Sequence, residues 1–235
     1  MFMSEYLNKI TDILYRIENE ESKKIESVSR LVAETIKHDG LIFVFGCGHS
    51  HLPGLDAFYR AGGLANVSPM LDTDLMLHNG AAKSSRMEKM SGIAHEVFRR
   101  YVPTEKDMIF IFSASGKNQV PVEMGDAARK AGIFSVGVSS SAYFEHGGRL
   151  HEYVDIYIDC KVPYGDACID VGKAKMGGLS TSAACFILNS CLINGAKDAL
   201  ETGYVPQIYI SGNVEGGREH NVKLEDMYLG RVKHL

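Results

Sequence analysis

Apolar residues recur along this chain with two alternating spacings. Residues 4–38 carry apolar side chains every three or four positions, as in one long amphipathic helix or two consecutive ones. Asp39 and Gly40 end this pattern, because glycine commonly follows the last helical residue. After Gly40, short runs of consecutive apolar residues alternate with stretches of helical spacing.

The short apolar runs predict strands, and the stretches between them predict helices. This alternation favours a parallel sheet with helices on both faces, a fold in which ligands bind beyond the carboxyl ends of the strands. The long glycine-rich connection 160–178 indicates a functional loop or a subunit contact. The predicted strands are 41–45, 65–71, 108–112, 133–138 and 154–158, with a weaker one at 207–211, and the predicted helices are 51–61, 87–101, 119–131 and 179–201.

Composition narrows the possible classes of protein. The 235 residues are 45% hydrophobic and carry a net charge of −4, which suits a single domain over 1–235 with a sizeable core. The chain has no basic run for nucleic acid, no apolar run long enough for a membrane and no signal peptide. Its five cysteines show no Cys-x-x-Cys spacing. We therefore expect a reduced, cytoplasmic protein whose partners include neither nucleic acid nor a membrane.

The most informative motif follows the strand predicted at 108–112. The sequence Ser113-Ala-Ser-Gly116 ends this strand, and a helical pattern opens near Pro121. The free N–H groups and dipole of a helix N-terminus favour an anion there, and serine hydroxyls add further donors. The motif therefore predicts an anion site.

A second glycine-rich loop, Gly46-Cys-Gly-His-Ser50, follows the first predicted strand. It is neither a dinucleotide fingerprint, since the third glycine is replaced by His51, nor a Walker loop, since no Gly-Lys-Ser/Thr follows. Either loop alone is compatible with an ordinary strand-to-helix turn. Together, on two strands of one sheet, they favour a phosphorylated ligand.

These two loops, with the helix start Leu179-Ser-Thr181, resemble the SIS (sugar isomerase) domain of phosphosugar isomerases and phosphosugar-binding regulators. The resemblance covers roughly residues 30–205, and the segments 145–150, 164–167 and 212–217 resemble the stand-alone bacterial members. It implies a three-layer αβα sandwich with a five-stranded parallel sheet. It also implies a homodimer or homotetramer with active sites near subunit boundaries. We expect the N-terminal helices (1–40) to pack on the domain or on a partner subunit.

The resemblance also assigns the residues that hold a sugar phosphate. Ser113 and Ser115 are expected to bind the phosphate together with the backbone around Gly116. Asn118 stands where the family has serine or threonine, and it either donates from its amide or caps the following helix. Gly48 and Ser50 correspond to the part of the family site that meets the sugar.

Interconversion of an aldose and a ketose moves a proton between adjacent carbons through an enediolate. This calls for a carboxylate base, often with a pKa raised by burial, and a histidine or lysine for the oxygens. Glu88, expected at the start of the helix 87–101, is the first candidate for the base, because related muramic acid 6-phosphate etherases have a carboxylate in a comparable place. The alternative is a solvated first-turn glutamate, and Asp56 is a second candidate.

Several loop histidines are candidates for the group that interacts with the oxygens of the sugar. His49 lies inside the first glycine-rich loop and is the preferred candidate, while His220 or His146 could reach the site of a neighbouring subunit. Lys175 replaces a glutamate of some family enzymes, so it either neutralises charge on the substrate or lies in a surface loop. His49 and His51 lack a carboxylate or cysteine partner, so we expect no metal and no cofactor.

Three functions are compatible with these motifs. The leading hypothesis is a sugar-phosphate isomerase. The alternatives are a lyase or etherase related to N-acetylmuramic acid 6-phosphate etherase, which would use similar carboxylates, and a non-catalytic phosphosugar sensor. Residues 1–40 show no basic helix-turn-helix pattern, which disfavours the sensor.

Overall fold

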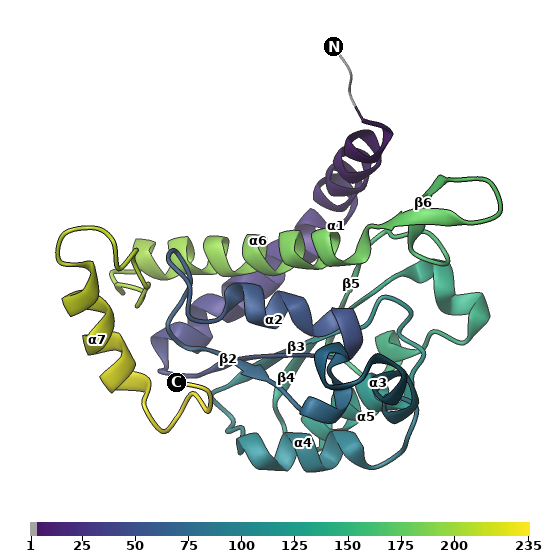
Figure 1. Cartoon of the computed structure of the whole chain (residues 1–235). Helices are drawn as coiled ribbons and strands as arrows, with labels where there is room; N and C mark the ends of the chain where they lie inside the picture. The colour runs from purple at the N-terminus through teal and green to yellow at the C-terminus, as the bar shows by residue number, and fades with distance from the viewer. Residues whose placement is uncertain (1–3) are drawn as a thin grey trace.

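A five-stranded, all-parallel sheet forms the centre of the computed structural model, which describes residues 4–235 (Figure 1). The first and third strands in the chain are buried along their whole length, which explains why they read as unbroken apolar runs. The order is β2-β1-β3-β4-β5, with β1 at Ile42–Gly46, β2 at Val67–Met70, β3 at Met108–Phe112, β4 at Phe134–Ser139 and β5 at Ile156–Asp159.

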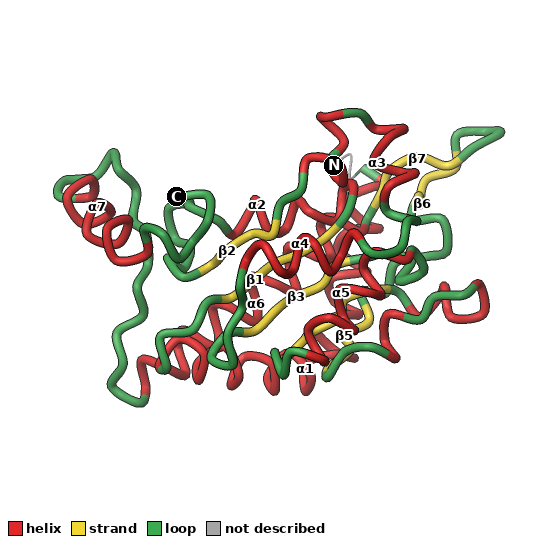
Figure 2. The backbone as a smooth tube through the Cα atoms, turned by 90° about the horizontal axis from the view of Figure 1, so that it is seen from below, coloured by secondary structure: helices red, strands yellow, loops and turns green. Residues whose placement is uncertain are grey.

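Helices cover both faces of the sheet and complete the expected three-layer sandwich. Ile42 and Val44 point to one face, whereas Phe43 and Phe45 point to the other, as the alternation of side chains along a strand requires. In Figure 2, α4 and α5 lie in front of the strands. The first face carries α1 (Glu5–Lys37), α2 (Leu52–Ala57) and α6 (Ser180–Glu201), and the second carries α4 (Ile93–Tyr101) and α5 (Gln119–Lys130).

The N-terminal segment is one continuous helix, α1, rather than two. Its C-terminal half packs against α6 of the same chain. Gly195 of α6 makes the close approach possible, because an added Cβ would lie 2.5 Å from a Val32 methyl carbon and 2.7 Å from the Ser29 carbonyl oxygen. The sequence pattern left both helix arrangements open. The polar stretch between the two apolar halves is helical, and its Glu21 is buried against Lys161 and the end of β5.

The helix predicted over 87–101 is wrong at its start. A short helix, α3 (Ala81–Met87), ends just before Glu88, and α4 begins only at Ile93. Gly92 separates them with a left-handed φ of 91°, and its N–H donates to the Glu123 carboxylate at 2.7 Å. A half-buried glycine turn thus interrupts what looked like one helical repeat.

Two further predictions need correction, and two elements in the rest of the chain were not predicted. The helix predicted at 51–61 ends at Ala57, and the weak strand at 207–211 is only a single bridge between Leu64 and Ile208. The connection 160–178 contains an antiparallel hairpin, β6 (Ala167–Asp170) and β7 (Lys175–Gly178). A C-terminal helix, α7 (Gly217–Tyr228), was not predicted.

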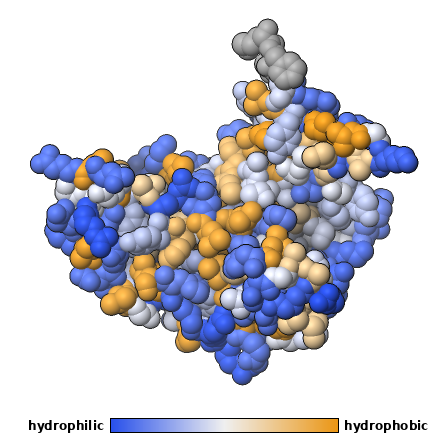
Figure 3. Space-filling model, viewed as in Figure 1, coloured by the Kyte–Doolittle hydropathy of each residue, from blue (hydrophilic) through white to orange (hydrophobic). Residues whose placement is uncertain are grey.

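Within residues 4–235, no helix combines the length and apolar character needed to cross a membrane. Apolar side chains nevertheless gather on one face of the surface, over α2 and α6 (Figure 3). Leu55, Ile193 and Leu200 are among the exposed members of this group.

We predict that Gly195→Ala destabilises the fold by about 1–3 kcal/mol, the usual cost of overpacking. The better helix propensity of alanine, worth about 1 kcal/mol, opposes this loss only in part. Chemical denaturation with urea measures the change. Asn194→Ala, at an exposed neighbouring position of α6, is the control and should be neutral or slightly stabilising. An unchanged midpoint for Gly195→Ala would contradict the tight α1–α6 packing.

Candidate functional site

The two glycine-rich loops lie side by side at the carboxyl edge of the sheet. The register pairs Gly46 with Phe112, so the residues after β1 and β3 emerge next to each other. These loops and the first turn of α6 line a narrow pocket of about 10 Å³, room for roughly one water molecule. The polar residues around it are His49, Ser50, Ser113, Ser180 and Thr181.

The first loop is held by glycines. Gly48 has a left-handed φ of 56°, and a Cβ at Gly46 would collide with the Ser50 carbonyl oxygen. Glycine is therefore required for the tight 3₁₀ turn Gly48–His51 that follows β1. This turn leaves His49 exposed at the rim of the pocket and places Ser50 in its wall.

The second loop is a compact turn that presents donors at the start of α5. Ser113 is buried, and its Oγ accepts from the Gly116 N–H at 3.2 Å, while the Ser115 Oγ accepts from the Lys117 N–H at 3.3 Å. Within residues 4–235, the N–H groups of Ser115 and Asn118 find no acceptor. Unpaired N–H groups at a helix N-terminus make this loop suited to an anion.

Gly116 fixes the shape of that turn. Its φ is 57°, and a Cβ would lie 2.9 Å from the Ser139 Oγ at the end of β4. Its carbonyl oxygen accepts from the N–H groups of Arg149 and Leu150 at 2.9 and 3.0 Å. The neighbouring strand and the segment after it therefore hold the loop from outside.

Glu88 lies against the start of α5 rather than in a first helical turn. It follows α3, and its carbonyl oxygen accepts from the Val120 N–H at 3.0 Å. Burial raises the pKa of its carboxyl group, and a polar interaction with the Asn118 side chain acts in the opposite direction. The Asn118 side chain makes no capping hydrogen bond, although Asn118 occupies the N-cap position of α5. The residue after the Ser113–Lys117 loop thus faces the candidate base.

Cys47 lies close to this carboxylate but is not suited to nucleophilic chemistry. Burial raises the pKa of its thiol well above the usual value, and the neighbouring Glu88 and Asp72 carboxylates raise it further. A thiol in such surroundings stays protonated at neutral pH.

His51 and His146 do not line the pocket, and each contacts other groups. The His51 Nδ1 pairs with the Gly48 carbonyl oxygen, and burial lowers the pKa of this buried ring. His146 is exposed and stacks on Tyr164 with ring centroids 4.1 Å apart.

His220 lies far from the pocket, at the opposite end of α6. It belongs to α7, which packs near the C-terminal end of α6, whereas the pocket lies at the N-terminal end of α6 (Figure 1). The 22 residues of α6 span about 33 Å, which separates His220 from the pocket. The His220 Nε2 pairs with the Ile208 carbonyl oxygen at 2.9 Å. Only a second subunit could bring His220 to the pocket, which stays a prediction.

The remaining candidates, Asp56 and Lys175, have other contacts. Asp56 pairs with Arg60 and accepts from the Asn189 amide at 3.1 Å. Lys175 begins β7 and faces the N-terminal half of α1 instead of the phosphate loop.

Sequence reasoning did not assign Ser180, Thr181 and Asp166. The Asp166 Oδ1 accepts from the N–H groups of Leu179 and Ser180 at 2.9 and 2.8 Å, and Oδ2 accepts from the Ser180 hydroxyl at 2.7 Å. Asp166 therefore caps α6 from the loop before β6 and orients Ser180 at the pocket. The hydroxyl residues at the predicted helix start were the available signal for two of the three.

Across residues 4–235, no three histidine, cysteine or acidic side chains gather as a possible metal site. Two histidines, His49 and His51, share one turn, but His51 is held by its backbone partner.

Comparison with known proteins identifies relatives of the whole chain and of its fold. Residues 5–140 match the SIS domain family. UPF0309 proteins of Thermoanaerobacter pseudethanolicus and Caldanaerobacter subterraneus are 36% and 37% identical, each over 98% of this chain and over 99% and 98% of their own.

Solved phosphoheptose isomerases of Neisseria gonorrhoeae and Francisella tularensis share the fold, each with a TM-score of 0.55. The alignments cover 80% and 82% of this chain and 94% and 95% of those chains, at 14% and 12% identity.

We predict that Asn118→Ala raises the pKa of Glu88, because the substitution removes an interaction that favours the charged carboxylate. Carbon-13 NMR titration of the glutamate carboxyl groups measures the shift, with Glu88→Gln identifying the resonance. Asn213→Ala, in an exposed loop, is the control and should leave the titration unchanged. A lowered or unchanged pKa in Asn118→Ala would contradict the assignment.

Proposed function

Because this chain belongs to the SIS domain family, we propose that it binds a phosphorylated sugar and interconverts its aldose and ketose forms. The observation that carries the proposal is the position of Glu88. A half-buried carboxyl group with a raised pKa faces Asn118, directly after a loop suited to a phosphate. The proposed base and the proposed anchor thus meet at one helix start.

In this proposal, the phosphate binds at the start of α5. Ser113 and Ser115 donate from their hydroxyl groups, and the loop around Gly116 contributes backbone N–H groups. The dipole of α5 adds favourable electrostatics for the charged phosphate. Ser50 and Gly48, on the adjacent loop, would contact the sugar, with Ser180 and Thr181 from α6 across the pocket.

Glu88 has the properties of a general base for the carbon acid. Burial raises the pKa of Glu88, and a general base works best when its pKa lies near the working pH. The raised pKa therefore suits Glu88 to this role near neutral pH. As a carboxylate, it would take the proton from the carbon next to the carbonyl group, and the electron pair would form the carbon–carbon double bond of an enediolate. Glu88 would then return the proton to the neighbouring carbon, while His49 would transfer a proton between the two oxygens.

The proposal includes a homodimer or homotetramer. The pocket of a single chain is too narrow for a sugar, so the ligand must extend beyond it. Exposed apolar residues such as Ile193 and Leu200 suit a subunit contact. A second chain could then supply His220 or His146 near the sugar.

We also place the protein in the cytoplasm. All five cysteines are free thiols, which fits a reducing compartment.

The first test is turnover on a panel of hexose, hexosamine and heptose phosphates. We expect one isomer to form, and Glu88→Gln to lower kcat by at least about 10²-fold, as loss of a general base does. The low-pH limb of kcat/KM should lie above the ordinary glutamate pKa of 4.5, because burial raises the pKa of Glu88.

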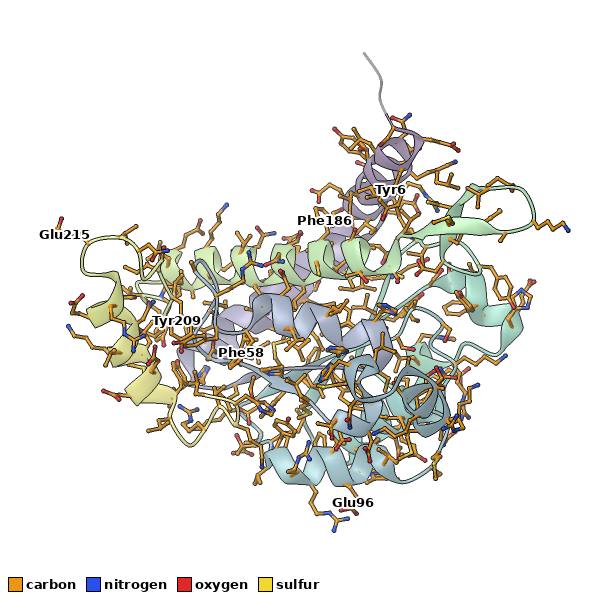
Figure 4. All side chains as sticks on the ribbon, viewed as in Figure 1. Tyr6, Phe58, Glu96, Phe186, Tyr209 and Glu215 are labelled. Atoms are coloured by element: carbon orange, nitrogen blue, oxygen red, sulfur yellow. The ribbon has the colours of Figure 1, made fainter. Side chains whose placement is uncertain are left out.

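Glu96→Gln, at an exposed position of α4 that points away from the sheet, is the matched control and should keep full activity (Figure 4). Release of lactate from muramic acid 6-phosphate would replace the isomerase proposal with an etherase. Tight binding without turnover on the whole panel would replace it with a sensor.

The second test concerns the phosphate loop. Ser113→Ala/Ser115→Ala should raise the Kd for a bound sugar phosphate at least about 100-fold, because two hydrogen bonds to a charged group are lost. Isothermal titration calorimetry measures the affinity, with Ser85→Ala on the exposed side of α3 as control. Equal affinity of the double variant and the unsubstituted protein would mean that the phosphate does not bind at this loop.

A further inference from the structure

A second polar cavity lies outside the candidate active site, between the N-terminal half of α1 and the connection 161–179. Its volume is about 390 Å³, within the usual range for small-molecule sites. Its charged lining is mainly cationic, with Lys9, Arg16, Lys161 and Lys175 against the single carboxylate of Asp12.

Secondary structure brings these charges together from three parts of the chain. Lys9, Asp12 and Arg16 lie three and four residues apart, so they share one face of α1. Lys161 follows β5, and Lys175 begins β7. The sequence therefore separates the cations by as many as 166 positions, which is why no basic motif was visible in it.

The cations differ in how far they are already paired. Lys161 is held by Glu21, Glu20 and Asp159 at 2.6, 3.0 and 3.3 Å, so its charge is satisfied. Arg16 is held less closely, with its Nε 3.5 Å from a Glu20 carboxylate oxygen, and most of its side chain is exposed to another acceptor.

Lys9 and Lys175 have no carboxylate within 4 Å in the described part of the chain. Asp170 stands opposite Lys175 in the hairpin ladder, but it forms no ion pair with it and does not line the cavity. Two free ammonium groups and part of a guanidinium group thus face one cavity, an arrangement that recognises phosphate oxygens.

The walls of the cavity are fixed rather than loose. The Tyr6 hydroxyl donates to the Gly178 carbonyl oxygen at 2.9 Å, and the Cys168 thiol donates to the Gly177 carbonyl oxygen at 3.0 Å. Figure 4 shows Tyr6 on α1 beside the hairpin. These contacts hold β7, and with it Lys175, next to α1.

From this geometry we propose that the cavity is a second anion site, which binds a small molecule carrying one or more phosphate groups. Lys9, Arg16 and Lys175 contact the phosphate oxygens, and Lys161 stays in its ion pairs as part of the wall. The site is separate from the Ser113–Gly116 loop and does not depend on the proposed isomerase activity.

The site is joined to the candidate active site through the connection behind it. Cys160 and Ser180 line the pocket at the carboxyl edge, whereas Lys161 and Leu179, their neighbours in sequence, line the basic cavity. Asp166 ties this connection to the first turn of α6. An anion bound by Lys175 therefore acts on the segment that positions Ser180.

The test uses the full chain and isothermal titration calorimetry with inorganic pyrophosphate at low ionic strength. We expect pyrophosphate to bind to the Ser113→Ala/Ser115→Ala variant, in which the Ser113–Gly116 loop has lost its two hydroxyl donors. Lys9→Gln/Lys175→Gln added to that background should weaken it at least about tenfold. Adenosine diphosphate, titrated in parallel, shows whether an organic group adds affinity.

Lys23→Gln/Lys223→Gln is the matched control, because it removes two exposed lysines that form no ion pair in residues 4–235. Equal weakening in this control would mean attraction by net charge alone and would overturn the proposal. Loss of all pyrophosphate binding in Ser113→Ala/Ser115→Ala would overturn it as well, since the β3 loop would then be the only anion site. Circular dichroism checks that each variant is folded.

Discussion

The candidate site depends on the parallel pairing of β1 with β3. Parallel strands carry their carboxyl ends to the same edge, and the pairing of Gly46 with Phe112 places two loops from distant parts of the sequence side by side. Gly48 and Gly116 in these loops adopt left-handed backbone conformations that few other residues tolerate. A one-residue change of register would move one loop along the edge and reverse the faces of its strand. The buried apolar side chains of both strands thus specify the geometry of a polar site.

Sequence was most informative where the structure is local or periodic. The unbroken apolar runs of β1 and β3 predicted buried parallel strands, and the glycine and serine loops after them predicted the anion-binding edge. The alternation of strands and helices also predicted helices on both faces of the sheet. The family resemblance then gave the number of strands as five, where the pattern offered a weaker sixth at 207–211. The roles of Ser113, Ser115 and Glu88 remain predictions, because a fold shared with phosphoheptose isomerases does not identify the atoms that react.

The errors arose where tertiary contacts override the pattern. Gly92 interrupts a convincing helical repeat, because Glu123 of another helix holds its N–H in a turn. As a result, Glu88 lies after one short helix instead of beginning a longer one. Asp166 was missed because it caps α6 from 14 residues away in sequence, whereas known capping signals stand next to the helix. The basic cavity was missed because its cations come from elements that only the fold brings together.

The contact between Val32 and Gly195 has a consequence for how the chain folds during synthesis. α1 is made well before α6, which covers its apolar face. The five strands are also complete before α6 exists, so the face of the sheet that carries α1, α2 and α6 is only partly covered until α6 is made. Contacts of such long sequence separation make folding slow. The nascent protein therefore exposes apolar surface until about residue 200 has left the ribosome, and this interval is when it most needs a chaperone.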